Sequence, residues 1–151
     1  MRVVVLFLFF FAGGAQITMA QNDPLQAYRW THRLLLVFTP SDATESAQSL
    51  RAVLDREACG LVERDMLIGW FSAMDGSRLG EEAIPDEMVA QWRSRLDVAA
   101  GEFGVFLIGK DGGVKGRYAA TPVLEEIFAL IDGMPMRRAE MRSRADVCEG
   151  Q

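Results

Sequence analysis

The chain has 151 residues, of which 50% are hydrophobic, and its net charge at neutral pH is −5. This length is enough to bury the core of one domain. The 16 basic and 21 acidic residues form no basic stripe with interleaved aromatic residues, so the composition gives no support for a nucleic-acid-binding protein.

The first twenty residues have the three regions of a secretory signal peptide. A positive charge at Arg2 is followed by an unbroken apolar run over residues 3–12 and by small residues before a cleavage point after Ala20. The apolar run is shorter than the roughly 20 residues that cross a bilayer as a helix. We therefore predict that residues 1–20 are removed and that residues 21–151 form a single periplasmic or secreted domain, with no membrane attachment after cleavage.

A continuous apolar run that reaches Phe38 from residue 33 predicts a strand covered on both faces, because a strand with one solvated face would alternate. Ahead of it, a single turn is expected to place Leu25 and Trp30 at the edge of the core. The two further tryptophans, Trp70 and Trp92, lie on apolar stripes and are also expected to be core residues.

The clearest helix of the chain follows this strand. Asp42 and Glu45 form a capping-box pattern at its start, because each side chain can accept a hydrogen bond from a free backbone N–H of the first turn. Apolar residues recur at helical spacing on one side, at Ala43, Ala47, Leu50 and Leu54. Gly60 is expected to end the helix.

The rest of the chain alternates short apolar runs with amphipathic stretches. Three more strands are predicted, over residues 66–71, 105–108 and 114–118. A loop leads to a helix that begins at Pro85 and ends at Gly101, another helix begins at Thr121, and a shorter one covers residues 136–144. An Asp-Gly turn at residues 110–113 joins the last two strands as a hairpin.

The resulting element order is β-α-β-α-β-β-α. This order predicts an α/β protein with the thioredoxin-like three-layer α/β/α architecture and a mixed four-stranded sheet. Strands separated by a helix are expected to be parallel, and the hairpin adds one antiparallel edge. A fold of this class does not by itself specify a function.

Two stretches resemble the peroxiredoxin branch of the thioredoxin-like proteins. Residues 40–47 are similar to the loop P-x-x-x-T-x-x-C, with Ala47 where that family has its peroxidatic cysteine. Residues 106–112 resemble the strand and turn F-x-I-D-x-x-G, and the spacing places Phe103 where the family has an arginine. Peroxide reduction requires a thiolate and a cation that lowers its pKa. Neither side chain supplies one, and the thioredoxin C-x-x-C motif is missing too, so the resemblance implies the fold without its catalytic groups.

A longer resemblance is to an uncharacterised family of secreted, peroxiredoxin-like domains. These domains occur in bacteria as short secreted proteins and in animals within larger extracellular proteins. The resemblance is carried by three motifs, over residues 63–65, 107–115 and 131–142, the last with the unusual core Met-Pro-Met-Arg-Arg. It implies the fold and brings no established activity.

Polar side chains gather at the start of the first helix, at Thr39, Ser41, Asp42 and Thr44. One interpretation is a small ligand pocket, because a helix N-terminus and hydroxyl groups can hold a ligand. The other is that these residues are caps and turn formers, since Ser, Thr and Asp are preferred there for satisfying the backbone.

Cys59 and Cys148 are the two cysteines of the chain. In an oxidising compartment they can form a structural disulfide that ties the C-terminal tail to the end of the first helix. Two separate thiols are a second interpretation. A redox-active pair is a third, although neither cysteine lies in a C-x-x-C motif or at a helix N-terminus, the positions that lower a thiol pKa.

The C-terminal segment joins methionines to a basic cluster, with Met134, Met136, Arg137 and Arg138 at its centre. One interpretation is a surface for a protein partner, since arginine pairs bind carboxylates. The alternative is internal, with the methionines packed under the last helix and the arginines balancing nearby glutamates. No metal site and no cofactor are predicted.

Together these observations predict a secreted thioredoxin-like domain without redox catalysis, which acts as a binding or structural module for an unknown protein partner. An enzyme is not the expected class, because Ala47 stands at the position of the nucleophile. The alternative is a thiol-disulfide oxidoreductase that uses Cys59 and Cys148 as a separated pair.

Overall fold

A six-stranded mixed sheet organises the chain, and the computed structural model describes residues 24–143. The strands lie in the order β4-β3-β2-β1-β5-β6. Their bounds are β1 (Arg33–Thr39), β2 (Met66–Ser72), β3 (Ser77–Leu79), β4 (Glu82–Ala83), β5 (Gly104–Ile108) and β6 (Val114–Tyr118). The predicted signal peptide and Cys148 lie outside the described residues.

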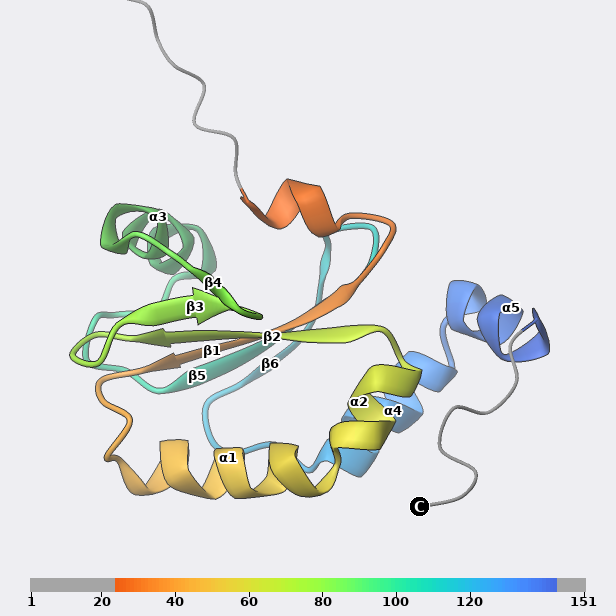
Figure 1. Ribbon diagram of the computed structural model, residues 1–151, viewed down its shortest axis with the longest axis horizontal. Helices are drawn as coiled ribbons and strands as arrows, with labels where there is room; N and C mark the ends of the chain where they lie inside the picture. The colour runs from red at the N-terminus through yellow and green to blue at the C-terminus, as the bar shows by residue number, and fades with distance from the viewer. Residues whose placement is uncertain (1–23, 144–151) are drawn as a thin grey trace, which may run out of the picture.

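Helices cover both faces of the sheet, as Figure 1 shows. Their bounds are η1 (Pro24–Tyr28), α1 (Glu45–Arg56), α2 (Ala58–Glu63), α3 (Asp86–Leu96), α4 (Leu124–Asp132) and α5 (Pro135–Ser143). α1, α2 and α4 lie on one face, η1 and α3 on the other, and α5 lies beside the end of the sheet where β2 begins. The predicted α/β/α architecture is confirmed. No helix in the described part of the chain is long and apolar enough to cross a membrane.

β1 is the central strand and belongs to both halves of the core. Every residue of β1 is buried, as the continuous apolar run predicts. Because side chains alternate along a strand, Leu35 and Val37 pack into the core under α1 and α4. Leu34, Leu36 and Phe38 pack into the second core, under α3.

The direction of β5 differs from the prediction. β1 and β2 are parallel, as expected, but β5 runs antiparallel to β1, with Phe38 opposite Gly104. Figure 1 shows α3 nearly end-on while the strands lie across the view, so α3 crosses the sheet instead of running back along it. The chain therefore enters β5 at the end of the sheet where β1 finishes. The expectation of a parallel strand is wrong because α3 is not a return crossover.

The sheet also has two strands more than the four predicted. The segment before Pro85, which the sequence predicts as a loop, contains the hairpin of β3 and β4 and extends the sheet beyond β2. Positive φ angles of 86° at Gly76 and 58° at Gly80 allow the two reversals of the chain. The two strands are only 3 and 2 residues long, too short to show an alternating pattern.

Two details of the first helical region differ from the prediction. Thr44, and not Asp42, caps α1, and its side chain accepts a hydrogen bond from the N–H of Ala47. Gly60 does not end a helix, because it lies within α2. A Cβ at Gly60 would stand 2.7 Å from the ring of Phe128, so the glycine is needed where α2 approaches α4.

α3 and α4 are shorter than predicted. α3 ends before Asp97, which adopts the left-handed conformation with φ 57° and ψ 54° and whose N–H bonds to the carbonyl of Arg93. Aspartate tolerates this conformation better than most residues, so the helix ends ahead of Gly101. α4 begins at Leu124, a few residues after Thr121.

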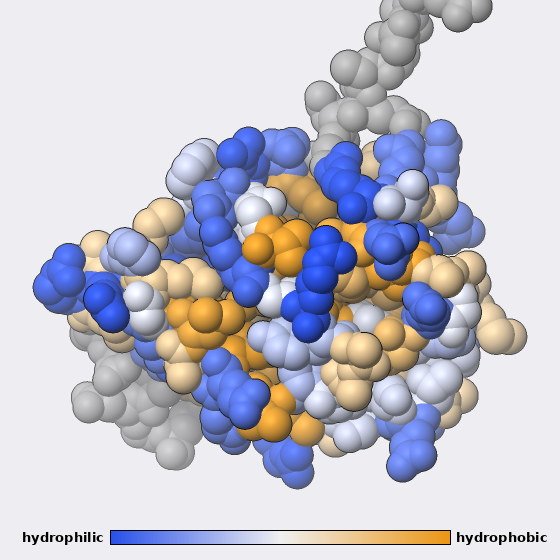
Figure 2. Space-filling view, turned by 180° about the vertical axis from the view of Figure 1, so that it is seen from behind, coloured by the Kyte–Doolittle hydropathy of each residue, from blue (hydrophilic) through white to orange (hydrophobic). Residues whose placement is uncertain are grey.

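The three tryptophans have different environments. Trp70 and Trp92 are buried in the two cores, as predicted. Trp30 is 61% exposed, so its assignment to the edge of the core is wrong. A positive φ of 67° at Trp30 turns the chain from η1 toward β1 and directs the indole outward. Figure 2, a view from behind, shows that other hydrophobic side chains reach the surface near the middle of the molecule, between hydrophilic ones.

Candidate functional site

The entrance loop, residues 39–44 from the last residue of β1 to the start of α1, brings together the four residues predicted as a ligand pocket. The hydroxyls of Thr39 and Thr44 donate to the carbonyl of Ser41 at 2.8 and 3.0 Å and lie 3.2 Å apart. Thr44 Oγ1 also accepts from the N–H of Ala47 at 3.3 Å. These hydrogen bonds are the ones that the interpretation as helix caps and turn residues predicts. A ligand-binding role for Thr39, Ser41, Asp42 and Thr44 remains a prediction.

Two aspartates connect the entrance loop to β2 and to the turn after it. The carboxylate of Asp42 accepts hydrogen bonds from Trp70 Nε1 at 2.7 Å and from Arg51. Asp75 accepts from the backbone N–H of Asp42 at 2.7 Å and from two serine hydroxyls, each at 3.0 Å. These donors, the backbone N–H first, hold the pKa of the Asp75 carboxyl below its usual range. Sequence reasoning missed Asp75 because it is 33 positions away from Asp42 along the chain.

Ala47 lies in the first turn of α1 and is fully buried. It stands where the peroxiredoxin resemblance places the peroxidatic cysteine. Phe103, which stands where the resemblance places an arginine, packs against the same apolar core. A methyl group and a phenyl ring cannot attack a peroxide or lower the pKa of a neighbour. These two side chains therefore bring neither a nucleophile nor an activating charge to the entrance loop.

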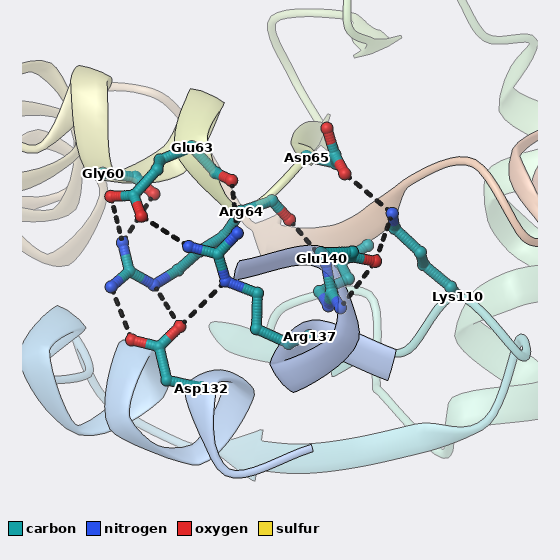
Figure 3. A network of polar contacts seen from close by, with 9 residues as sticks. Gly60, Glu63, Arg64, Asp65, Lys110, Asp132, Arg137 and Glu140 are labelled. Atoms are coloured by element: carbon teal, nitrogen blue, oxygen red, sulfur yellow. Dashed lines mark hydrogen bonds and ion pairs between the residues drawn. The ribbon is translucent and has the colours of Figure 1, made fainter. Parts of the chain in front are cut away.

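A second polar site, the ionic network, joins α2, β1, the β5–β6 turn, the end of α4 and α5 (Figure 3). In its first half, Arg137 of α5 is only 2% exposed. Its Nε donates to Asp132 at 3.1 Å, its Nη1 donates to the carbonyl of Glu63 at 2.9 Å, and its Nη2 contacts the Glu63 carboxylate. Arg64 donates to the same Asp132 carboxylate at 3.1 and 2.6 Å. Asp132 is thus shared by two guanidinium groups.

The second half of the ionic network lies around Glu140. Arg33 donates to this carboxylate at 3.1 and 3.3 Å and to the carbonyl of Arg64 at 2.8 Å. Lys110 Nζ lies 2.8 Å from Glu140 and 2.7 Å from Asp65. The Nε of Arg33 is buried without a hydrogen-bond partner among the described residues. Burying a donor without a partner lowers the stability of the fold by roughly 1 to 3 kcal/mol. The charged contacts of the same side chain must offset this loss.

Burial and charge act in opposite directions on the carboxyls of the ionic network. Burial alone would raise the pKa of Asp132 and of Glu140, because it disfavours the charged form. The two arginines that contact Asp132, and the lysine and arginine that contact Glu140, outweigh this effect. Both pKa values therefore lie below the usual range, and both groups are ionised at neutral pH.

The ionic network attaches α5 to the rest of the domain. Arg137 is the buried residue of this helix, and no apolar side chain of the helix is buried. Met136 and Met141 are 41% and 43% exposed. Ion pairs on the inner side, and not an apolar stripe, therefore position α5.

The structure separates the four residues predicted to bind a partner. Arg137 is engaged inside the ionic network, and Met134 is half-buried against the core under α4. Met136 and Arg138 are exposed. Arg137 is paired internally, as the alternative predicts, but with Glu63 and Asp132 instead of the nearby glutamates that the sequence suggests. A partner surface remains a prediction for the exposed residues.

Cys59 lies half-buried at the second position of α2, so the expectation that neither cysteine lies at a helix N-terminus is wrong for Cys59. Because Cys148 lies outside the described residues, the disulfide between them remains a prediction. The described residues contain no group of three or more His, Cys, Asp or Glu side chains that could hold a metal ion.

Sequence reasoning did not find the ionic network, although the motifs that build it stand out in the chain. Glu63, Lys110, Asp132 and Glu140 belong to the three stretches 63–65, 107–115 and 131–142. These stretches meet in space through ion pairs that join residues as far as 74 positions apart. The sequence feature that could have indicated the ionic network is a cluster of charged residues in each stretch, next to a predicted buried strand or helix.

Comparison with known proteins agrees with this description. The family model described as Domain of unknown function (DUF4174) matches residues 24–140. Human Sushi repeat-containing protein SRPX is 31% identical over 121 residues, which cover 78% of this chain and 26% of that protein. Coiled-coil domain-containing protein 80 of Danio rerio is 31% identical over 134 residues, which cover 78% of this chain and 15% of that protein. The chain therefore spans about a quarter or less of these two relatives.

Solved structures show the same fold at low sequence identity. The reduced 2-Cys peroxiredoxin of Plasmodium vivax superimposes with a TM-score of 0.56 at 17% identity, over 76% of this chain and 84% of that one. Thioredoxin peroxidase I of Plasmodium yoelii gives a TM-score of 0.55 at 20% identity, over 84% and 85%. Fold and sequence thus agree, and the chain belongs to the DUF4174 family, an uncharacterised family with a peroxiredoxin-like, thioredoxin-like fold.

Proposed function

We propose that this chain is a secreted, non-redox thioredoxin-like module that binds another protein through the exposed side of α5. The exposed side of α5 is defined by four residues, Met136, Arg138, Met141 and Arg142. The observation that carries the proposal is the way in which α5 is attached to the rest of the domain, by ion pairs on its inner side. α5 is held from within by ion pairs of the buried Arg137, while its two methionines are partly exposed and Arg138 and Arg142 are exposed.

The composition of this side suits an acidic protein surface. Arginine and methionine are enriched at protein interfaces, and a flexible thioether adapts its shape to a partner. Arg138 and Arg142 carry positive charge that would pair with carboxylates. Because the ionic network already fixes the helix, less conformational freedom would be lost on binding.

The non-redox part of the proposal is supported by the entrance loop. Ala47 is buried, and the polar groups around it bond to each other. The secreted part is supported by the signal-peptide pattern of the first twenty residues. The relatives are several times longer than this chain, which fits a domain that works as one module among others.

Capture experiments test the binding site. The mature chain and the variant R138E/R142E would be immobilised and exposed to periplasmic or extracellular extract, with R56E/R78E as a control of equal charge change on other exposed positions. We expect a partner that the mature chain and the control retain and that R138E/R142E loses at least tenfold. Equal capture by all three proteins, or no partner above an empty support, would contradict a site on α5.

Turnover assays test the non-redox part separately. The mature chain and the cysteine-free variant C59S/C148S would be given hydrogen peroxide with a thiol reductant, and insulin as a disulfide substrate. We expect equal, background rates for the two proteins. Turnover by the mature chain well above that of the variant would instead support the thiol-disulfide oxidoreductase with Cys59 and Cys148.

A further inference from the structure

A cavity of about 140 Å³ lies between η1, α3 and the strands β1, β5 and β6. It is on the α3 face of the sheet, whereas α1 and the entrance loop lie against the opposite face (Figure 1). Neither the entrance loop nor the ionic network contributes a lining residue. Figure 2 shows hydrophobic surface bordered by hydrophilic side chains near the middle of the molecule.

The interior of this cavity is apolar. Its walls include Leu25, Tyr28, Leu34, Leu36, Trp92 and Ile108. An apolar cavity of about 150 Å³ in a protein core is large enough to bind benzene. The space is therefore suited to one aromatic ring or to an alkyl chain of similar volume.

The rim of the cavity is basic. Arg29, Arg95, Arg117 and His32 belong to the lining, and none of the described lining residues is Asp or Glu. Arg29 Nη1 donates to the side-chain oxygen of Gln26 at 3.2 Å, and Arg117 Nη1 donates to the carbonyl of Leu96 at 2.7 Å. Both acceptors are neutral and take up one N–H each, so each guanidinium has further donors for a ligand.

The two arginines are also held in position. The side chain of Arg29 runs alongside the β5–β6 turn, where a Cβ at Gly112 would lie 3.2 Å from its Nε. Gly112 has a φ of 81°, so the turn both needs glycine and leaves room for this side chain. The Arg117 guanidinium lies 5.3 Å from the centre of the Phe106 ring. Two cations are thus placed in advance at the mouth of an apolar space.

We propose that this cavity binds a small organic anion with a ring-sized apolar body and a carboxylate head, such as an aromatic carboxylic acid. The apolar body lies against Trp92 and the leucines, and the carboxylate accepts hydrogen bonds from Arg29 and Arg117 at the rim. Burial of the body provides affinity, and the paired charge selects anions over neutral or cationic compounds of the same shape. This proposal does not depend on the binding of a protein to α5.

Titration of the ¹⁵N-labelled mature chain with benzoate, followed by backbone amide shifts, tests the proposal. Benzyl alcohol and benzylamine serve as neutral and cationic compounds of similar size, and acetate serves as an anion without the ring. We expect benzoate to shift amides of η1, α3 and the β5–β6 turn, and to bind at least tenfold more tightly than the other three. Equal binding of benzoate and benzyl alcohol, or shifts confined to other regions, would overturn the proposal.

Two variants locate the site. R29Q/R117Q is expected to weaken benzoate binding by about tenfold or more, a loss of about 1.4 kcal/mol, while the matched surface control R56Q/R78Q binds as the original chain does. V114W places a bulky ring at a lining position that is 41% exposed and is expected to abolish binding. If R29Q/R117Q fails to fold, V114W by itself tests whether benzoate binds in this cavity. Undiminished binding by a folded R29Q/R117Q or by V114W would contradict the assignment.

Discussion

Arg137 shows how a single charged side chain can take the structural role usually left to an apolar one. It is the buried residue of α5, and its guanidinium reaches two carboxylates on two other helices. Buried ion pairs seldom stabilise more than an apolar replacement would, but the loss of one partner is costly because the other charges remain. Together with Glu140, which pairs with Arg33 and Lys110, Arg137 therefore fixes the position of α5.

We therefore predict that R137A lowers the free energy of unfolding by about 2 kcal/mol, below the usual range for breaking a buried pair. The reason for the smaller figure is that Glu63 and Asp132 are 21% and 30% exposed, so water can solvate the abandoned carboxylates in part. Urea unfolding at pH 7 measures the difference. R138A, which changes an exposed neighbour, is expected to stay within about 0.5 kcal/mol of the original chain. Equal effects of the two variants would show that the buried pairs do not hold α5.

The lowered pKa values of Asp132 and Glu140 predict a dependence of stability on pH. A carboxyl whose pKa is lower in the folded than in the unfolded chain contributes stability above its ordinary pKa of about 4. This contribution is lost as the pH falls from there through the folded pKa, because the unfolded chain then binds more protons. We expect the free energy of unfolding to decrease over this range in urea experiments from pH 7 to pH 3.

E140Q is the matched variant for this dependence, since glutamine keeps the shape of the side chain without its titration. The stability difference between the original chain and E140Q is expected to be largest at pH 7 and to narrow toward pH 3. A difference that does not change with pH would mean that the contacts with Lys110 and Arg33 do not lower the pKa of Glu140 in the folded chain.

At the scale of elements, α2 and α4 approach each other at one glycine. A Cβ at Gly60 would meet Phe128 Cε2 at 2.7 Å, and the ring cannot easily move because Arg64 stacks on it at 4.3 Å. Alanine is favoured over glycine in a helix by about 1 kcal/mol. We nevertheless predict that G60A is destabilised by about 1 to 2 kcal/mol, because overpacking outweighs helix propensity.

Two further variants separate packing from propensity at this contact. A Cβ at Gly101 would meet no atom within 4 Å, so G101A is expected to be neutral within about 0.5 kcal/mol. In a chain that already carries F128L, G60A is expected to cost less than it does alone, because the smaller side chain leaves room. Thermal unfolding of these variants beside the original chain gives the comparison. An unchanged cost of G60A in the F128L chain would rule out the ring as its cause.

The direction of β5 is another result at the scale of elements. The apolar run at residues 105–108 predicted the strand itself, because local hydrophobicity is sufficient to identify it. Its direction depends on the path of α3 across the sheet, which no local pattern records. The same reasoning applies to β3 and β4, which exist because they pair with β2 and with each other.

At the scale of the whole molecule, the predicted disulfide between Cys59 and Cys148 would close a loop of about 90 residues. Chain entropy then predicts a stabilisation of roughly 4 kcal/mol. We expect the mature chain purified without reductant to resist alkylation, whereas the reduced chain gains two alkyl groups by intact mass. C148S is expected to unfold at lower urea concentration than the original chain. Two free thiols in the unreduced protein would support the interpretation of separate cysteines.

The proposed binding sites are distributed over different parts of the molecule. The exposed side of α5 lies beside one end of the sheet, and the cavity with Arg29 and Arg117 lies on the α3 face. The entrance loop, where peroxiredoxin-like chemistry would be expected, belongs to the α1 side. Mutations at one of these sites are therefore expected to leave the others intact, which allows each proposal to be tested alone.

The sequence by itself determined the fold class, the central strand, the hairpin at residues 110–113 and the position of α5 along the chain, because hydrophobic spacing and turn residues act locally. Through its resemblance to peroxiredoxins, the sequence also predicts that Ala47 stands where that family has its peroxidatic cysteine. Only the tertiary structure decided which charges pair, that Arg137 is buried, that Gly60 serves a helix contact, and that Arg29 and Arg117 meet at one cavity. These properties depend on residues far apart in the chain, and their free energies arise only when folding removes water from between them.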